Sequence, residues 1–381
     1  MNILYLETNI PPYCGGIERV SWNVSAYLKE HGHECFFGYV EEDSPEIDVK
    51  HKVKFSPYGS IPEILGSLEN FVKTNSINII LNQGFYYRNF CEAMNLLKQK
   101  YHVGVVSCVH YSINELFPRK FSLSFKLKDI ICRMVYGHGM KARVLRPFYK
   151  CSDRLVMLSD AYCPDVVNYL EYKDAPKLCA IGNPLTREHV EVPLSEHRKK
   201  QVLICARLTD PQKNITGALR IWQEVEKRGY EEWELIIAGT GPDEDMLHSY
   251  AQELGLKRVT WLGQIKDTIP LYQHARIFMM TSSWEGRPVT IPEALQTGCV
   301  PIVFNSFLSL GDLITNDVDG LVINYPDEKA YADALEELIN DEEKWQRLSS
   351  QGISNSQQFS IKNIGKQWDK LFEKIKKENE S

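Results

Sequence analysis

The sequence of 381 residues has no long uninterrupted apolar run. None of its windows approaches the roughly 18 consecutive apolar residues that a membrane-spanning helix needs. Its first residues, MNILYLETN, also lack the basic stretch and the long apolar stretch of a secretory signal peptide. They are typical of a first β-strand, and we therefore expect a cytoplasmic protein.

The sequence also lacks an excess of positive charge and any Cys-x-x-Cys pair. A net charge of −6 at pH 7 gives no reason to expect nucleic acid as a partner. Without that paired spacing, the ten cysteines do not predict a zinc site. Many lie in apolar runs, as Cys108 does in VVSCV, which is typical of buried thiols in a reducing compartment.

What the chain does have is a regular alternation of short apolar runs and amphipathic stretches. A hydrophobic content of 43% is that of a folded globular protein, and the length suits two domains. Runs such as NILYLE, INIILNQ, QVLICARL and ARIFMMTS are typical of parallel strands that are covered on both faces. Strands that alternate with helices predict an α/β fold with two doubly wound, Rossmann-like domains.

A polar stretch with two prolines at 182–200 marks the expected boundary between these domains. We predict an N-terminal domain over 1–182, a C-terminal domain over 183–358 and a last helix over 359–381. Ligands of doubly wound sheets bind outside the carboxyl ends of the strands. Candidate site residues are therefore expected just after the apolar runs.

Two cations follow the strand predicted for QVLICARL. Arg207 lies at its end, and Lys213 lies on the loop that follows. Because arginine offers a fork of donors and lysine a point charge, the two suit a diphosphate. A pair of solvated surface cations is the alternative.

Gly239 and Gly241 follow the next strand, in IIAGTGPDED, and precede a helix. Glycine lets a backbone approach a ligand, and the N-terminus of a helix favours an anion. The pattern is only half of a dinucleotide-binding fingerprint, because Glu244 stands where a third glycine would be. An ordinary tight turn is the alternative.

Two glutamates stand eight positions apart in SSWEGRPVTIPEALQTG. We expect Glu285 just past a strand, whereas Pro288 and Pro292 suit the start of a helix that carries Glu293 in its first turns. Both carboxylates can accept hydrogen bonds from the hydroxyls of a sugar or a ribose. The alternatives are an exposed loop charge for Glu285 and a favourable contact with the helix dipole for Glu293.

The N-terminal half supplies further candidates. Gly15 and Gly16 precede a helix, where backbone N–H groups can face a phosphate. His110 ends a strand and can move a proton or donate a hydrogen bond to a sugar hydroxyl. A glycine turn without a ligand and a structural histidine are the alternatives.

Taken together and in this order, these residues resemble a retaining glycosyltransferase of family 4 with the GT-B fold. The resemblance is carried by Gly15–Gly16, YLKEHGHECFFGYV, His110, Arg207 with Lys213, GTGP at 239–242, and the pair Glu285 and Glu293 followed by ALQTG. It covers nearly the whole chain and is strongest over residues 200–325.

The resemblance implies a role for each residue. Arg207 and Lys213 would hold the diphosphate of a nucleotide-sugar, Glu285 would contact the donor sugar, and Glu293 would bind the ribose. The implied catalytic residues are His110, Arg207, Lys213 and Glu285, and the implied donor-binding residues are Gly15, Gly16, Gly239, Gly241, Gly286, Arg287, Pro288 and Glu293. The last helix would cross back onto the N-terminal domain, and the two domains would face a central cleft.

The resemblance also implies the chemistry. We expect transfer with retention from a UDP-sugar to a saccharide or lipid-linked acceptor, in the synthesis of a bacterial surface polysaccharide. No metal ion or other cofactor is expected, and neither DED at 243–245 nor DVD at 317–319 is taken as a metal site. Arg287 departs from the family, which often has an aromatic or aliphatic residue there, and its charge could contact the donor.

Residues 115–154 are strongly basic, with ten Lys/Arg, three acids and a net charge of +7. Apolar residues are interleaved with these cations: Phe117, Phe121, Phe125, Ile130, Ile131 and Tyr136. A basic amphipathic helix is typical of proteins that bind an anionic membrane surface. Such a helix would hold the protein at the inner face of the plasma membrane, near a lipid-linked acceptor. A solvated helix pair beside the acceptor is the alternative.

Other functions explain fewer of these residues. A nucleotide-sugar epimerase of the same fold does not account for Arg207, Lys213 and the paired glutamates together. A glycoside hydrolase uses paired carboxylates but needs no diphosphate site, and the incomplete glycine pattern disfavours a nicotinamide dehydrogenase. A non-catalytic module that binds a sugar nucleotide would have the same residues and remains the closest alternative.

Overall fold

The computed structural model describes residues 1–12, 15–110 and 123–380, with the side chains of all of these except 123–127 and 380. Their contacts divide the chain into two compact units. The first unit is Met1–Pro184 together with Ile361–Ser381, and the second is Leu185–Ser360.

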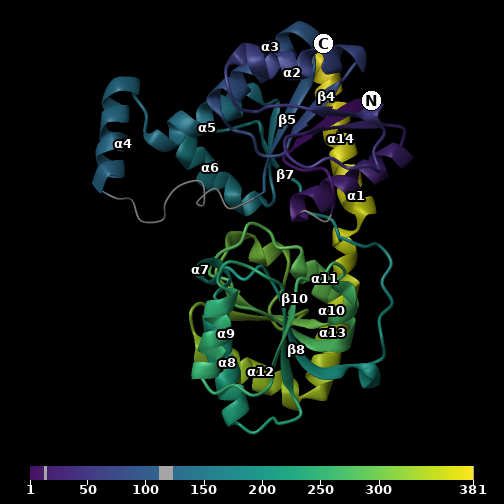
Figure 1. Ribbon diagram of the computed structural model, residues 1–381, viewed down its shortest axis with the longest axis vertical. Coiled ribbons are helices and arrows are strands. Elements are labelled where there is room, and N and C mark those ends of the chain that lie inside the picture. The colour runs from purple at the N-terminus through teal and green to yellow at the C-terminus, as the bar shows by residue number, and fades with distance from the viewer. Residues whose placement is uncertain (13–14, 111–122, 381) are drawn as a thin grey trace. The chain divides into compact units, whose positions relative to one another are not determined.

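The first unit is built on a sheet of seven parallel strands in the order β3-β2-β1-β4-β5-β6-β7 (Figure 1). The strands are β1 (Asn2–Glu7), β2 (Glu34–Tyr39), β3 (Lys52–Lys54), β4 (Ile79–Asn82), β5 (Gly104–Val109), β6 (Arg154–Met157) and β7 (Leu178–Ala180). The helices are α1 (Gly16–Glu30), α2 (Ile61–Thr74), α3 (Arg88–Tyr101), α4 (Leu123–Tyr136), α5 (Met140–Cys151), α6 (Cys163–Leu170) and α14 (Ile361–Glu380).

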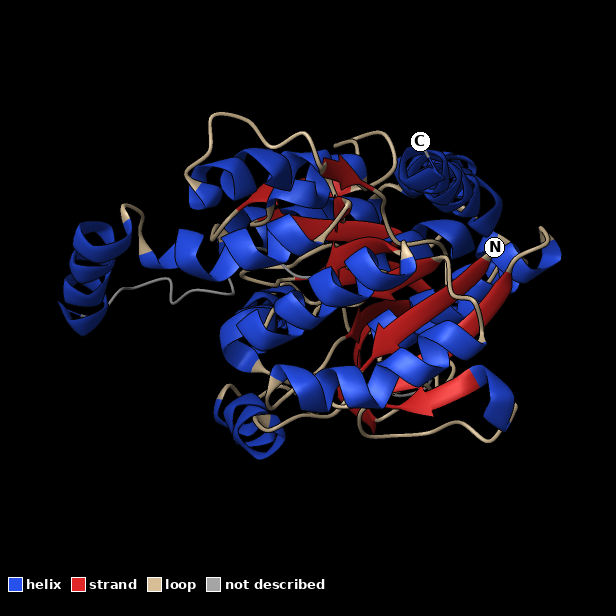
Figure 2. Ribbon diagram, turned by 90° about the horizontal axis from the view of Figure 1, so that it is seen from above, coloured by secondary structure: helices blue, strands red, loops and turns tan. Residues whose placement is uncertain are grey.

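Helices cover both faces of this sheet (Figure 2). Leu4 and Leu6 of β1 pack in the cluster that α2, α3 and α5 complete. Tyr5 points the other way, toward Val20 of α1 and Trp368 of α14. Because successive side chains of a strand alternate between faces, a strand covered on both sides must be apolar throughout. This explains the continuous run NILYLE.

The last helix of the chain is part of the first unit. Helix α14 packs on α1 and reaches β5, with Phe372 and Ile375 fully buried. Two glycines allow this close contact: a Cβ at Gly365 would lie 2.3 Å from the Tyr27 ring, and one at Gly104 would lie 2.6 Å from Ile375. The absence of side chains at both positions therefore lets α14 approach the helix and the strand.

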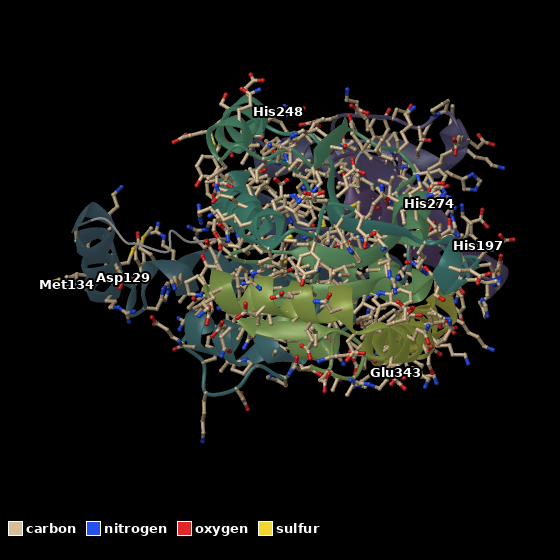
Figure 3. All side chains as sticks on the ribbon, turned by 90° about the horizontal axis from the view of Figure 1, so that it is seen from below. Asp129, Met134, His197, His248, His274 and Glu343 are labelled. Atoms are coloured by element: carbon tan, nitrogen blue, oxygen red, sulfur yellow. The ribbon has the colours of Figure 1, made fainter. Side chains whose placement is uncertain are left out.

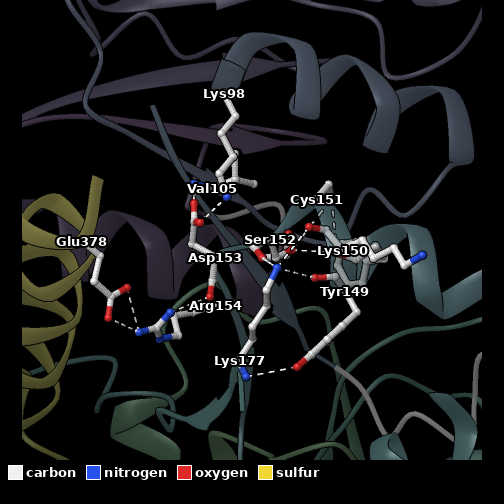
Figure 4. Close-up of polar contacts among 12 residues, drawn as sticks. Lys98, Val105, Tyr149, Lys150, Cys151, Ser152, Asp153, Arg154, Lys177 and Glu378 are labelled. Carbon is white, nitrogen blue, oxygen red and sulfur yellow. Dashed lines mark hydrogen bonds and ion pairs between the residues drawn. The ribbon is translucent and has the colours of Figure 1, made fainter. Parts of the chain in front are cut away.

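Charged contacts at the amino edge of the sheet support this packing (Figure 4). Asp153 accepts a hydrogen bond of 2.8 Å from the Val105 N–H and forms an ion pair with Lys98. The next residue, Arg154, forms an ion pair of 2.6 Å with Glu378 of α14. The start of β6 is thus tied to β5 on one side and to the last helix on the other.

The second unit is built on six parallel strands in the order β10-β9-β8-β11-β12-β13. The strands are β8 (Lys199–Cys205), β9 (Glu234–Ala238), β10 (Val259–Gly263), β11 (Ala275–Met280), β12 (Val300–Asn305) and β13 (Leu321–Asn324). The helices are α7 (Asp210–Lys213), α8 (Ile215–Lys227), α9 (Glu244–Glu253), α10 (Ile269–His274), α11 (Thr290–Thr297), α12 (Glu328–Asn340) and α13 (Glu342–Ser356).

Two apolar clusters cover the faces of this second sheet. One contains Trp222 of α8 and Tyr331 of α12, and the other contains Ile291 of α11. Phe359, which we expected in the last helix, lies in the second cluster instead. The backbone at Ser360 is extended, with φ −57 and ψ 148, so the helix begins only at the next residue. Parallel sheets covered on both faces in both units confirm the predicted α/β, doubly wound fold class.

Shortening Ile375 to alanine tests the contribution of α14 to the first unit. We expect Ile375→Ala to lower the free energy of unfolding by about 2–5 kcal/mol, because a fully buried side chain is replaced by a cavity. Lys370→Ala, at an exposed position of the same helix, should change it by less than about 0.5 kcal/mol. Chemical denaturation followed by circular dichroism measures both, and equal effects would contradict the packing role.

Candidate active site

The strand order of the second sheet reverses at β8. This strand lies between β9 and β11, and the helices that follow β8 and β11 pack in different clusters, on opposite faces. In doubly wound sheets the loops on either side of such a reversal leave a crevice at the carboxyl edge, where ligands bind. Arg207 follows β8 directly, and Glu285 follows β11. Lys213, which we expected on a loop, is the last residue of the short helix α7 that comes after β8.

The structure brings Lys213 and Glu285 together. The Lys213 Nζ lies 2.5 Å from Oε1 of Glu285, whose carboxylate is buried with only 6% of the residue exposed. Burial of a carboxylate is costly unless it is paired, so Lys213 makes this position tenable. Arg207, just past the end of β8, is exposed. Sequence analysis had placed these three residues in one site but had not predicted the ion pair.

Backbone contacts fix the loops that carry this pair. The Thr281 hydroxyl donates to the Lys213 carbonyl at 3.1 Å, and the Ser283 N–H donates to the Gln212 carbonyl at 2.7 Å. Asn214 adopts a left-handed conformation with φ 50, which asparagine tolerates, and its amide donates to the Thr281 carbonyl at 3.2 Å. These hydrogen bonds therefore hold the segments after β8 and β11 against each other.

Gly239 and Gly241 are required by contact between two backbones. A Cβ at Gly239 would lie 1.8 Å from the Ala206 carbonyl oxygen, and one at Gly241 would lie 2.2 Å from that of Leu208. The Leu208 N–H also donates to the Thr240 carbonyl at 2.9 Å. This packing accounts for both glycines, and a role in donor binding stays a prediction.

Glu293 lies in the first turn of α11 and is buried, with 3% exposed. Its Oε1 accepts a hydrogen bond of 2.7 Å from the Thr186 hydroxyl. The position at the start of a helix favours a negative charge. Sequence analysis had not included Thr186, whose only signal was its place in the polar stretch at the domain boundary.

The residues between the two glutamates contact their own unit. The Gly286 carbonyl accepts a hydrogen bond of 2.6 Å from the Ser309 hydroxyl, and the Arg287 guanidinium lies 5.4 Å from the centre of the Phe359 ring. Pro288 stands two residues before α11 begins. The charge of Arg287 thus has an aromatic neighbour within the unit, and its contact with a donor stays a prediction.

In each of the stretches DED at 243–245 and DVD at 317–319, one aspartate accepts a hydrogen bond from the backbone. Asp243 accepts a hydrogen bond of 2.8 Å from the Asp210 N–H, which links the loops after β8 and β9. Asp319 accepts one of 2.7 Å from the Thr315 N–H. Asp243 therefore supports the carboxyl edge of the second sheet, whereas Asp319 supports the turn that leads into β13 at the opposite edge.

In the first unit, Gly15 and Gly16 stand at the start of α1. A Cβ at Gly15 would lie 2.5 Å from a carboxylate oxygen of Glu18, so a neighbouring side chain occupies that space. A Cβ at Gly16 would meet no described atom within 4 Å. Because the Glu18 carboxylate is the end of a flexible side chain that can move aside, packing among the described residues requires neither glycine, and a role for both in ligand approach stays a prediction.

His110 follows β5 and is oriented by a chain of side chains. Its Nε2 lies 2.6 Å from the Gln83 Oε1, and the Gln83 amide nitrogen donates to the Ser21 hydroxyl at 2.9 Å. An amide oxygen can only accept, so Nε2 carries the proton and Nδ1 is the acceptor. Burial lowers the pKa of His110 to about 4, so the ring is neutral near pH 7.

A buried acid that sequence analysis missed lies at the end of β1. Glu7 is 2% exposed, and burial raises the pKa of its carboxyl well above the usual range. Since β1 and β4 are the strands at which the order of the first sheet reverses, Glu7 stands at the carboxyl edge beside its crevice. The feature of the sequence that could have pointed to Glu7 is its place as the one acid at the end of the apolar run NILYLE.

Comparison with known proteins decides what kind of site this is. Residues 186–355, nearly all of the second unit, match the family model of group 1 glycosyl transferases. The chain is a glycosyltransferase with the GT-B fold. This glycosyltransferase is 22% identical to an uncharacterized glycosyltransferase of Haemophilus influenzae, over 93% of this chain and 95% of the relative. The match favours glycosyl transfer over the epimerase, hydrolase and dehydrogenase alternatives.

A second relative covers less of the glycosyltransferase, and a solved structure covers nearly all of it. The relative is GalNAc-alpha-(1->4)-GalNAc-alpha-(1->3)-diNAcBac-PP-undecaprenol alpha-1,4-N-acetyl-D-galactosaminyltransferase of Campylobacter jejuni, 29% identical over 61% of this chain and 63% of its own. The crystal structure of Anabaena Alr3699/HepE in complex with UDP is 16% identical, with a TM-score of 0.76 over 98% of this chain and 100% of that chain. It shares the fold.

Gly16→Ala separates a structural glycine from a functional one. We expect unchanged or slightly raised stability, by up to about 1 kcal/mol, because the space is open and alanine favours a helix. If the backbone at Gly16 approaches a substrate phosphate, the rate of glycosyl transfer should fall about tenfold or more. Gly66→Ala, also in a helix with open space, is the matched control for stability and should keep full activity. Full activity in both variants would exclude the role of Gly16.

The chain from Ser21 to His110 predicts how the histidine titrates. NMR of nitrogen-labelled histidine should show His110 neutral, with its proton on Nε2, from pH 8 down to pH 6, since its pKa is about 4. Gln83→Glu places a carboxylate beside the ring and should raise this pKa, because a negative charge stabilises the imidazolium. His110→Asn assigns the signal. Titration of the parent ring near its ordinary value of 6.5 would contradict the orientation and burial described here.

Proposed function

We propose that this glycosyltransferase is a retaining enzyme of family 4 that transfers a sugar from a UDP-sugar to a saccharide or lipid-linked acceptor. The observation that carries the proposal is the Lys213–Glu285 pair, which lies at the same carboxyl edge of the second sheet as Arg207. In this pair, Lys213 provides a cation that can bind a diphosphate, and Glu285 provides a carboxylate that can accept hydrogen bonds from sugar hydroxyls. A module that only binds a sugar nucleotide would need the same contacts but would form no product.

Lys213 and Arg207 suit the diphosphate. The Lys213 ammonium has three donors, one of which points to Glu285, so the others are available for phosphate oxygens. Arg207 is exposed at the same edge and offers planar, bidentate recognition. Together they would neutralise the charge that develops on the leaving UDP, which is where electrostatic stabilisation speeds the reaction most.

The two glutamates suit two different sugars of one donor. Glu285 is fixed in a loop by Lys213, and its carboxylate is an acceptor of the kind that the hydroxyls of the transferred sugar need. Glu293 is fixed on a helix, where its carboxylate accepts a hydrogen bond from Thr186, and a carboxylate is an acceptor of the kind that ribose hydroxyls need. The different elements that carry them explain the spacing of eight residues.

Retention is proposed to follow attack on the same face from which UDP leaves. The bond between the anomeric carbon and the phosphate oxygen breaks, the acceptor oxygen forms the new bond, and the acceptor proton passes to the leaving phosphate. The cations of the site favour this step by stabilising the separated UDP. The proposal assigns no metal ion or other cofactor to the reaction.

The comparisons support the finer assignments without deciding them. The Campylobacter relative is named for a saccharide acceptor carried on undecaprenol diphosphate, and the Anabaena structure contains UDP. We therefore propose UDP as the nucleotide and a lipid-linked saccharide of a bacterial surface polysaccharide as the acceptor. Such an acceptor would be met at the anionic inner face of the plasma membrane, through the basic segment 115–154. Residues 115–122 of that segment lie outside the described part of the chain.

A thermal-shift experiment with UDP, GDP, ADP and NAD tests the donor site. UDP at about a hundred times its dissociation constant should add about 2.7 kcal/mol and raise the melting temperature by about 2–4 °C. Arg207→Ala removes an exposed cation and should weaken UDP binding about tenfold to a hundredfold, and Lys213→Ala should also abolish turnover. Lys257→Ala, at the amino edge of the same sheet, should bind UDP like the parent.

The results separate the alternatives clearly. Stabilisation by NAD or ADP but not by UDP would overturn the proposed donor. Binding of UDP with no sugar transferred from any UDP-sugar to lipid extracts would favour the non-catalytic module. Loss of UDP binding in Lys257→Ala would show that the effect of Arg207→Ala is not specific to the site.

A further inference from the structure

Helix α4 presents its apolar side to solvent. Ile130 is 53% exposed, Ile131 57%, Met134 81% and Val135 64%. At about 100° per residue these four side chains share an arc of about 140° on the helix. A surface helix normally turns an apolar stripe of this width toward the protein core. Figures 1 and 2 show α4 standing outside the layers of the first unit, beside α5.

The opposite side of α4 holds it to the protein by polar contacts. Asp129 accepts a hydrogen bond of 2.7 Å from the Met140 N–H at the start of α5, and Arg133 forms an ion pair of 2.8 Å with Glu171. Cys132, on the same side, is buried. Figure 3 labels Asp129 on the side of α4 toward the rest of the unit and Met134 on the outer side. The orientation of the helix is therefore fixed, with its apolar side outward.

Many of the basic side chains that suggested electrostatic binding already have partners. Arg133 is paired with Glu171. The Lys141 ammonium lies 3.6 Å from the centre of the Tyr169 ring, and the Arg143 guanidinium lies 4.1 Å from that of Tyr136. These contacts change the expectation from the sequence, in which the charge of the segment was the main attraction. Within the described part of the chain, by contrast, the apolar side of α4 remains exposed.

The charge of the region limits what can cover that side. Residues 128–151 hold six Lys/Arg and one Asp, a net charge of +5. A second copy of the chain that docked here would bring the same positive charge to the contact, which disfavours a dimer. An anionic bilayer offers an apolar layer below a negatively charged surface and so matches both features. Lys128 is exposed next to the apolar arc, where it can reach the head groups.

We propose that α4 inserts its outward side, Ile130, Ile131, Met134 and Val135, into the surface of an anionic bilayer. This inference rests on the proposed lipid-linked acceptor and names how the enzyme reaches it. No helix of the described chain is long and apolar enough to cross a membrane, and α4 would lie in the interface. Because insertion dominates, binding should survive high salt, whereas binding by charge alone would be screened away.

Vesicle flotation with a double variant tests this proposal. The probes are vesicles of phosphatidylcholine alone and with phosphatidylglycerol, at about 0.1 M and about 1 M salt, which shortens the Debye length to about 3 Å. The parent should float with anionic vesicles at both salt concentrations. Ile131→Asp with Met134→Asp should lower vesicle binding at least about tenfold. The matched control is Val49→Asp with Met246→Asp, which adds the same charge at positions that are 78% and 44% exposed, and it should bind like the parent.

Three results would overturn the proposal. The first is that the parent protein does not float with anionic vesicles, and the second is that the α4 variant floats as well as the control. The third is that the parent loses its vesicle binding at high salt. Light scattering is run on the same samples, since a dimer that the α4 variant converts to a monomer would identify a second copy as the partner. The UDP thermal shift should be equal in all three proteins. This separates failure of the membrane contact from failure of the proposed donor site.

Discussion

The pairing of a buried carboxylate with a lysine at the end of the short helix α7 is the contact on which the candidate active site depends. Glu285 is almost fully removed from solvent, and its charge is tenable there because Lys213 lies 2.5 Å away. β8 and β11 are parallel neighbours, so both loops leave the same edge of the sheet. The cation and the acceptor thus hold each other in place, and fixed charges of this kind are the arrangement that electrostatic catalysis requires.

The same loops show that residues of a functional site also carry the fold. Gly239 and Gly241 permit backbone contacts between the loops after β8 and β9, and Asp243 completes the link. A substitution at either glycine would therefore disturb the whole carboxyl edge and could not isolate a role in donor binding. Arg207 and Gly16 are more informative positions, because no close packing among the described residues depends on them.

Two helices of the first unit use their apolar sides in opposite ways. Helix α14 buries Phe372 and Ile375 against α1 and β5, and so brings the end of the chain into the core of its first unit. Helix α4 is anchored by Asp129 and Arg133 and turns Met134 outward. Both have the periodicity of an amphipathic helix. Among the described residues, α14 turns its apolar side toward the core, whereas the polar contacts of α4 hold its apolar side toward solvent.

The sequence by itself determined the fold class and the set of candidate residues. Continuous apolar runs require strands covered on both faces, and the order of Arg207, Lys213, Glu285 and Glu293 after such runs places them at carboxyl edges. Tertiary structure alone decided the Lys213–Glu285 contact, the neutral state of His110 and the buried position of Glu7. These depend on which strands are neighbours and on what covers a side chain. Which strands are neighbours is set by the strand order across the sheet, and what covers a side chain is set by segments that are distant in the sequence. Neither leaves a local pattern in the spacing of residues along the chain.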